Sequence, residues 1–232
     1  MELTDQQIER YSRQILIAPI GGVGQERLLQ SRLLIAGESE DTGPVLAYMA
    51  GAGVGTIQWL AGSADDAQEA ARAAALIAET RALNRDVKVS RTRDLPAESN
   101  LALVLISGAA ALEAARALCA ASERPTMVFA RLAEPGQIAA VSSTPCPVCA
   151  DSQIMAPLTR RAANARLIAM LAAAEALKLL ANATTPTPTL IEFAGYVTRT
   201  RPLTQAASGP AMGANRCACA AIANRNAGAR DA

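Results

Sequence analysis

Four of the five cysteines are spaced for binding a metal ion. Cys146 and Cys149 form a C-x-x-C pair, and Cys217 and Cys219 form a C-x-C pair further along the chain. Two thiolates at such a spacing can reach one tetrahedral ion, and four thiolates would complete a closed structural zinc site without a catalytic role. We therefore predict a zinc ion that clips the last segment to the preceding loop, with a redox dithiol or unliganded thiols as the alternatives.

The chain contains no histidine. This excludes histidine general bases, Ser-His-Asp and Cys-His catalysis, and every His-ligated metal site. The fifth cysteine, Cys119, stands among alanines in a predicted helix. A nucleophilic thiol needs an activating neighbour, so we predict that Cys119 is a core residue.

Composition and charge narrow the function classes further. The chain has 232 residues, 51% of them apolar, and a formal net charge of +1, which suits one large α/β domain with a small appendage. Because no long basic or acidic run exists, we expect no nucleic-acid or membrane-surface binding. No apolar stretch reaches the roughly 18 residues of a membrane-spanning helix. The polar, acidic start is unlike a signal peptide, so we expect a cytoplasmic location.

Hydrophobic patterning predicts alternating strands and helices in the order β-α-β-α-β-β-α-β-β, followed by a long helix and a hairpin. The expected strands are 32–36, 56–60, 87–92, 101–106, 126–130 and 138–142, with a closing hairpin of 190–193 and 196–199. The expected helices are 43–53, 64–83, 109–121 and 158–180. Such alternation predicts a Rossmann-like α/β fold, with a doubly wound, mainly parallel sheet and an antiparallel extension.

Three regions are expected along the chain. Residues 1–31 form an N-terminal helical arm, in which a helix over 4–12 is capped by Thr4 and Gln7, a turn follows at 21–24, and a second helix covers 25–31. Residues 32–204 form the main domain. Residues 205–232 carry two cysteines and are otherwise rich in Ala, Gly and Asn, so we expect a poorly ordered tail.

The loop after the first strand carries acids where a phosphate-binding loop would carry glycines. Residues 37–43 read GESEDTG. Glycines let backbone N–H groups approach a phosphate closely, whereas three carboxylates would repel a triphosphate. An acid at this helix amino terminus can instead stabilise the helix dipole, with Asp41 or Thr42 as the cap. We therefore predict that protein carboxylates take the place of a nucleotide's phosphate.

Several short motifs in one order resemble the ThiF/MoeB/HesA family, the prokaryotic relatives of ubiquitin-activating enzymes. They are RYSRQ at 10–14, GQ at 24–25, AGVGTI at 52–57, LNRDV at 83–87, GQ at 136–137 and CPVC at 146–149. The similarity covers about residues 3–220. It implies a ThiF-type Rossmann-like domain and a usually dimeric enzyme with a structural zinc held by two cysteine pairs. Family members use ATP and magnesium to adenylate the C-terminal glycine of a ubiquitin-like sulfur carrier.

The chain departs from this family where the family binds ATP. The glycine-rich loop is acidic, the arginine-bearing loop after the second strand is missing, and Asp65 and Asp66 there are expected in the first turn of a helix. Ser107 and Gly108 follow the fourth strand, where the family has a magnesium-binding aspartate, and residues 150–180 contain no cysteine nucleophile. We predict that ATP and magnesium bind weakly or not at all, and that the chain alone does not adenylate.

The resemblance assigns one further role, to Arg13. In the family, the arginine of the R-Q pair lies on the arm and reaches the ATP of the neighbouring subunit. We predict a non-catalytic or impaired subunit of a homo- or heterodimer, which lends Arg13 in trans and binds a carrier protein or a catalytic ThiF/MoeB-type subunit. The alternative interpretation is that Arg10 and Arg13 are ordinary surface residues on one helix face.

Two other functions stay open on the sequence. The first is an active adenylyltransferase of a ubiquitin-like sulfur carrier with a divergent nucleotide site. Its small polar pocket would include Gly37, Ser39, Thr42 and Gly43, with Ser63 and Ser107 nearby, at the carboxyl ends of the strands. The second is a structural or assembly protein whose acidic loop is a contact surface.

Overall fold

A single twisted sheet runs through the molecule. The computed structural model describes residues 2–61, 67–95, 99–120, 126–141, 158, 160–184, 189–194 and 197–202. In this part of the chain the eight strands are arranged in the order β3-β2-β1-β4-β5-β6-β7-β8. Their bounds are β1 Arg32–Gly37, β2 Thr56–Ala61, β3 Lys88–Thr92, β4 Leu101–Ile106, β5 Thr126–Arg131, β6 Gly136–Val141, β7 Thr189–Ala194 and β8 Val197–Pro202.

The sheet has a parallel part and an antiparallel part. Strands β1 to β5 pair in parallel, and β6, β7 and β8 are added antiparallel to them. The described helices are α1 Asp5–Ile15, α2 Gly21–Gln30, α3 Ser39–Gly51, α4 Ala67–Leu83, α5 Ala109–Ala120 and α7 Ala165–Leu180. The predicted α/β class, with a mainly parallel sheet and an antiparallel extension, is confirmed.

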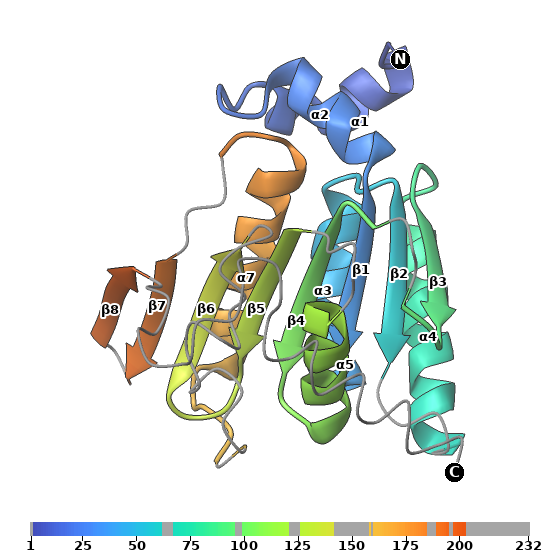
Figure 1. The fold of residues 1–232 in the computed structure, drawn as a ribbon. Helices are drawn as coiled ribbons and strands as arrows, with labels where there is room; N and C mark the ends of the chain where they lie inside the picture. Colours follow the sequence, from blue (N-terminus) through green and yellow to red (C-terminus); the bar gives the residue numbers. More distant parts are fainter. Residues whose placement is uncertain are drawn as a thin grey trace.

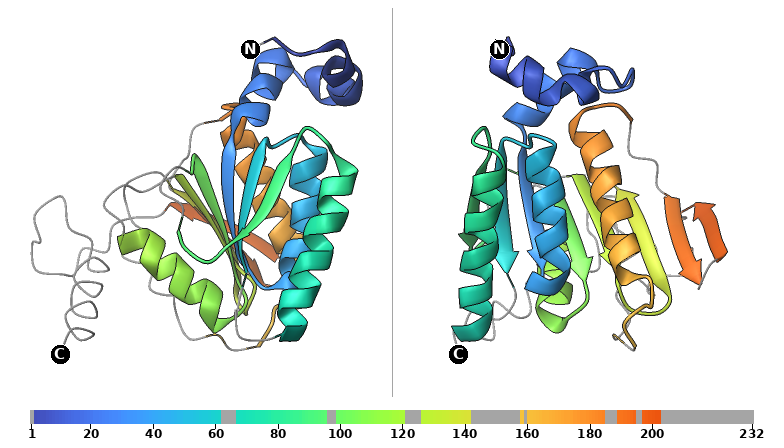
Figure 2. Two further views of the ribbon diagram at one scale, coloured as in Figure 1. Left: turned by 90° about the vertical axis from the view of Figure 1, so that its right-hand side faces the viewer. Right: turned by 180° about the vertical axis from the view of Figure 1, so that it is seen from behind.

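Helices cover both faces of the sheet. Helices α3, α4 and α7 lie on one face and α5 lies on the other (Figure 2). The two helices of the arm, α1 and α2, lie across the end of the sheet at which β1 begins (Figure 1). No helix in the described part of the chain is long and apolar enough to cross a membrane.

The core consists of two apolar layers separated by the sheet. Leu33 and Ile35 of β1 join the layer beneath α3 and α7, while Leu34 and Ala36 join the layer beneath α5. A strand buried on both faces reads as a continuous apolar run, and all six residues of β4 are buried. For this reason the sequence predicted the bounds of β4 correctly. Cys119 is also buried, as predicted.

Three local predictions were wrong. The predicted turn at 21–24 is the first turn of α2. The reason is that Gly24 is buried and lets α2 approach the end of α7. A Cβ added at Gly24 would lie 3.4 Å from the Ala181 carbonyl oxygen. The predicted helix over 158–180 begins only at Ala165. Before it, Ala133 and Arg161 form an antiparallel bridge, because backbone hydrogen bonds join residues 160–162 to residues 132–134. The third is the predicted cap of α3, which belongs to the site described next.

Candidate functional site

The carboxyl ends of β1 and β4 meet at the point where the strand order reverses. From β1 the chain turns toward β2 and β3, and β4 lies on the other side of β1. In open α/β sheets this switch point forms the crevice in which ligands bind. Gly37 ends β1 here and Glu38 follows it, while Ser107 and Gly108 follow β4.

Glu38 fills part of this crevice. It is the N-cap residue of α3, but its side chain makes no capping hydrogen bond. Its carboxylate lies against Gly108, where an added Cβ would be 2.8 Å from Glu38 Oε1. Burial is the main cause that raises the pKa of Glu38, and the nearby carboxylates of Glu69 and Asp41 raise it further. A glutamate in this position occupies space and adds negative charge where a ligand would enter.

A second carboxylate, that of Glu69, accepts a hydrogen bond from the first backbone N–H group of α3. The backbone N–H of Ser39 donates to Glu69 Oε1 at 3.0 Å, and the Ser39 hydroxyl donates to the same oxygen. Glu69 comes from the first turn of α4, thirty residues further along the chain. The free N–H groups and the dipole of a helix amino terminus attract anions, so Glu69 holds the position that a bound anion would hold.

The predicted cap of α3 by Asp41 or Thr42 is wrong. The helix begins at Ser39, so both residues lie inside its first turns. The physical reason is that the donor of Ser39 finds its acceptor on α4, which local sequence patterns do not reveal. The Thr42 hydroxyl is buried and has no hydrogen-bond partner within the described residues.

Asp41 is instead part of a buried ion pair. It is 2% exposed and accepts two hydrogen bonds from Arg161, of which Nη1 to Oδ2 measures 3.1 Å. Arg161 also lies 3.6 Å from Glu40. The hydrogen bond to Asp41 is the main cause that raises the pKa of Arg161. A planar guanidinium that binds a carboxylate through both nitrogens is the stronger form of ion pair.

Backbone pairing holds Arg161 in place. The Ala162 N–H donates to the Leu132 carbonyl at 2.8 Å, and the Glu134 N–H donates to the Arg160 carbonyl at 2.8 Å. The segment before α7 therefore crosses the end of β5 and pins the first turn of α3. Sequence reasoning missed Arg161, since the residue was assigned to a helix and its partner lies 120 positions away.

Arg131 is a second basic residue that the sequence did not single out. It ends β5 in register with Gln137 and is 2% exposed. Burial lowers its pKa. Nearby, the Ser107 hydroxyl is buried without a hydrogen-bond partner in the described part of the chain. The strand ends therefore hold some polar groups suited to an anion beside the acidic cluster of Glu38, Glu40, Asp41 and Glu69.

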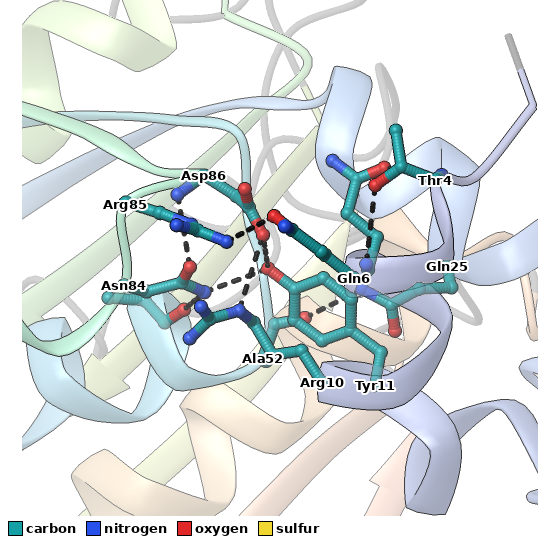
Figure 3. Close-up of polar contacts among 11 residues, drawn as sticks. Thr4, Gln6, Arg10, Tyr11, Gln25, Ala52, Asn84, Arg85 and Asp86 are labelled. Atoms are coloured by element: carbon teal, nitrogen blue, oxygen red, sulfur yellow. Dashed lines mark hydrogen bonds and ion pairs between the residues drawn. The ribbon is translucent and has the colours of Figure 1, made fainter.

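The arm is fixed to the body by a polar network around Tyr11 (Figure 3). The Tyr11 hydroxyl donates to Asp86 Oδ2 at 3.2 Å and accepts from Asn84 Nδ2 at 2.8 Å. Arg10 pairs with the same carboxylate at 3.4 Å. The ring of Tyr11 lies over Gly53, where a Cβ would come within 2.7 Å of Cζ. The predicted capping box of Thr4 and Gln7 is present.

Arg13 and Arg10 differ in whether they contact the body of the molecule. Arg10 contacts the body, whereas Arg13 is exposed and forms no ion pair with any described residue. Its place on the arm leaves it available to another molecule. The pocket residues Gly37, Ser39, Thr42 and Gly43 lie at the acidic cluster, while Ser63, Asp65 and Asp66 lie outside the described residues.

The four predicted zinc ligands, Cys146, Cys149, Cys217 and Cys219, also lie outside the described residues. Within the part of the chain that the structure describes, no group of three or more Cys, Asp or Glu side chains is arranged to hold a metal ion. The zinc site therefore stays a prediction.

Comparison with known proteins finds sequence similarity over a short segment and a similar fold over most of the chain. No family model matches the chain. Over 55 residues, 24% of this chain, it is 47% identical to the sulfur carrier protein ThiS adenylyltransferase of Escherichia coli K12. It is 44% identical, also over 55 residues, to the probable adenylyltransferase/sulfurtransferase MoeZ of Mycobacterium tuberculosis. The chain is a relative of the ThiF/MoeB-type adenylyltransferases.

The extent of these matches is limited to a short region. The 55 residues span 22% of the E. coli protein and 14% of the M. tuberculosis protein. The fold extends further: the structure of E. coli MccB with ATP matches with a TM-score of 0.66 and 14% identity, over 85% of this chain and 72% of that chain. PaaA matches with a TM-score of 0.61 and 14% identity, over 87% and 84%. Identity at this level shows a shared fold.

The pair of neighbouring arginines before α7 allows a matched test of the buried ion pair. Replacing Arg161 by Ala leaves the buried Asp41 carboxylate without its counter-charge, and we expect a loss of about 2 kcal/mol in the free energy of unfolding. This is below the range for fully buried pairs because Arg161 is itself 40% exposed. Replacing Arg160, whose side chain is 80% exposed, should cause no measurable change. Urea denaturation of both variants measures the difference, and equal effects would contradict this account.

The raised pKa of Glu38 predicts a pH-dependent stability. A raised carboxyl pKa means that the folded state favours the neutral acid, so this stabilisation is present below the unfolded pKa of about 4.3 and is lost as the pH rises through the folded pKa. Glu38→Gln stays neutral at every pH. Its melting temperature should therefore match wild type near pH 4 and exceed it by a few degrees at pH 7.5. Glu113→Gln, on the surface of α5, controls for the loss of one negative charge, and a constant difference across the pH range would contradict the assignment.

Proposed function

We propose that this chain takes part in the activation of a ubiquitin-like sulfur carrier as a catalytically impaired or non-catalytic subunit. The observation that carries this proposal is the occupation of the switch point by the chain's own carboxylates. Glu69 accepts the Ser39 N–H at the amino terminus of α3, and Glu38 lies against Gly108. A nucleotide phosphate at this place would displace Glu69 and lie beside Glu38.

The residues present do not fit ATP with magnesium. A triphosphate needs backbone N–H groups and cations, but the acidic cluster brings four carboxylates and its first N–H group is already bonded. Like charges within a few ångströms repel strongly in a partly buried site. Asp41 is held by Arg161 and Glu69 by Ser39, so neither is free to bind a metal ion.

The arm supports a partner role. Ile8, Leu16, Ile17 and Val23 are between 47% and 84% exposed, and Arg13 is exposed among them. Aliphatic side chains gathered at one end of a molecule mark an interaction surface. We propose that this surface contacts a second subunit, a further copy or a catalytic ThiF/MoeB-type protein, and that Arg13 extends into that subunit's site. A carrier protein is the other expected partner.

A second function is supported by other residues of the same site. Arg131 is a buried cation at the end of β5, and the hydroxyl groups of Ser107 and Thr42 have no hydrogen-bond partner among the described residues. If Glu69 swung away on the surface of α4, these groups would lie near a ligand at the strand ends. The alternative is an active, ATP-dependent adenylyltransferase of a sulfur carrier with a divergent nucleotide site.

Calorimetric titration of the purified, zinc-quantified chain with ATP and magnesium separates the two functions. For the impaired subunit we expect no binding at millimolar ATP, because the carboxylates occupy the phosphate position. Micromolar binding, together with pyrophosphate release in the presence of a carrier, would establish the active enzyme instead. A Glu38→Gln, Glu69→Gln variant removes two negative charges, so recovered nucleotide affinity in this variant would identify the carboxylates as the cause.

The role of Arg13 has its own test. Arg13→Ala should leave the melting temperature of the isolated chain unchanged, since the side chain is exposed and forms no ion pair with a described residue. In a reconstituted complex with a catalytic ThiF/MoeB-type subunit, it should lower the rate of carrier adenylation by at least about tenfold. Arg72→Ala, an exposed arginine on α4, is the control. If both variants support the wild-type rate, Arg13 has no role in trans.

A further inference from the structure

A cavity lies at the opposite end of the sheet from the acidic cluster. Its volume is about 420 Å³, and it is lined by the amino ends of β4 and β5 and by the last turns of α2 and α7. This volume falls within the range of small-molecule pockets. The cavity lies where the arm meets the body, because α2 belongs to the arm and α7 to the body (Figure 1).

The cavity lining has a distinct chemistry. Leu101, Leu179 and Leu180 provide an apolar part. The polar part consists of one guanidinium, three amides and three hydroxyl groups: Arg27, then Gln30, Asn100 and Asn182, then Ser31, Thr126 and Thr184. None of the described residues that line the cavity is an Asp or a Glu. These side chains therefore offer one positive charge, from Arg27, together with amide and hydroxyl groups.

One of these donors is already used, because the Ser31 hydroxyl donates to the Arg27 carbonyl at 2.6 Å. Asn182 has a positive φ of 56° and ends α7 in a Schellman motif, since the Ala183 N–H donates to the Lys178 carbonyl and the Asn182 N–H to the Leu179 carbonyl. These bonds satisfy the end of α7 without help from Arg27. Asn100 Oδ1 accepts the Arg32 N–H at 2.7 Å, which leaves the Asn100 NH2 group to donate.

We propose that this cavity binds a small organic anion whose carboxylate or phosphate pairs with Arg27 and whose hydroxyl-bearing body contacts the amides. A charge-assisted hydrogen bond to a guanidinium is stronger than a neutral one, and the apolar residues accommodate the carbon skeleton. This site is independent of the proposed function, because it lies at the other end of the strands from the acidic cluster.

Binding at this place would couple to the arm. Arg27 and Gln30 belong to α2, whereas Leu179 and Asn182 belong to the end of α7. A ligand that contacts both holds α2 against the body and stabilises the docked arm by mass action. The ligand therefore favours the docked position of the arm.

The test uses three probes on the full chain: glucose 6-phosphate, gluconate and uncharged glucose. Calorimetry should give a Kd below about 1 mM for at least one anion and no binding for glucose. The two anions separate a phosphate from a carboxylate ligand. Hydrogen exchange in α2 should slow when the anion binds, which a site remote from the arm would not cause.

Variants locate the site. Arg27→Gln should weaken anion binding by about tenfold or more, and Asn182→Asp should do the same, because Asp tolerates the positive φ of Asn but adds a negative charge. Arg166→Gln, at the first turn of α7 and about 20 Å away along the helix, should bind as wild type does. Absence of binding by both anions, equal binding of glucose, or full affinity in Arg27→Gln would each overturn the proposal.

Discussion

The amino terminus of α3 needs a negative partner, and the rest of the site is arranged around how that need is met. Glu69 bonds to Ser39, which draws the start of α4 toward the switch point. Asp41, in the first turn of the helix, is buried and therefore requires a cation. Arg161 supplies it, and this fixes the segment before α7 across the end of β5. The acidic residues at the start of α3 and α4 thus hold three parts of the chain together.

This arrangement explains why removing one acid need not restore a nucleotide site. Glu38 and Glu69 lie close enough for each to raise the energy of the other when ionised. Their positions depend on different elements, the end of β1 and the start of α4. A bound phosphate would have to replace one carboxylate and neutralise the other. The cluster satisfies the helix dipole of α3 with side chains of this chain.

The sequence predicted features that depend on local pattern and missed features that depend on distant pairs. Strand β4 is apolar throughout, and its bounds were predicted correctly. The capping box of Thr4 and Gln7 spans three residues and was also predicted. The start of α3 was misplaced because its partner Glu69 is thirty positions away, and Arg161 was missed because Asp41 is 120 positions away. The cavity at the arm has no sequence signal, since its lining comes from four separate segments.

The residues that carry the family resemblance differ from those that would carry its chemistry. Tyr11 lies over Gly53, Gln25 donates to the Ala52 carbonyl at 3.1 Å, and Asn84 donates to the Ala50 carbonyl at 2.7 Å. These four motif residues, Tyr11, Gln25, Gly53 and Asn84, dock the arm onto the end of α3. They therefore maintain the fold and the surface that the docked arm presents. The carboxyl ends of the strands, where a phosphate would bind, are the part of the chain that departs from the family pattern. The chain therefore keeps the polar contacts that dock the arm, while its own carboxylates lie at the strand ends.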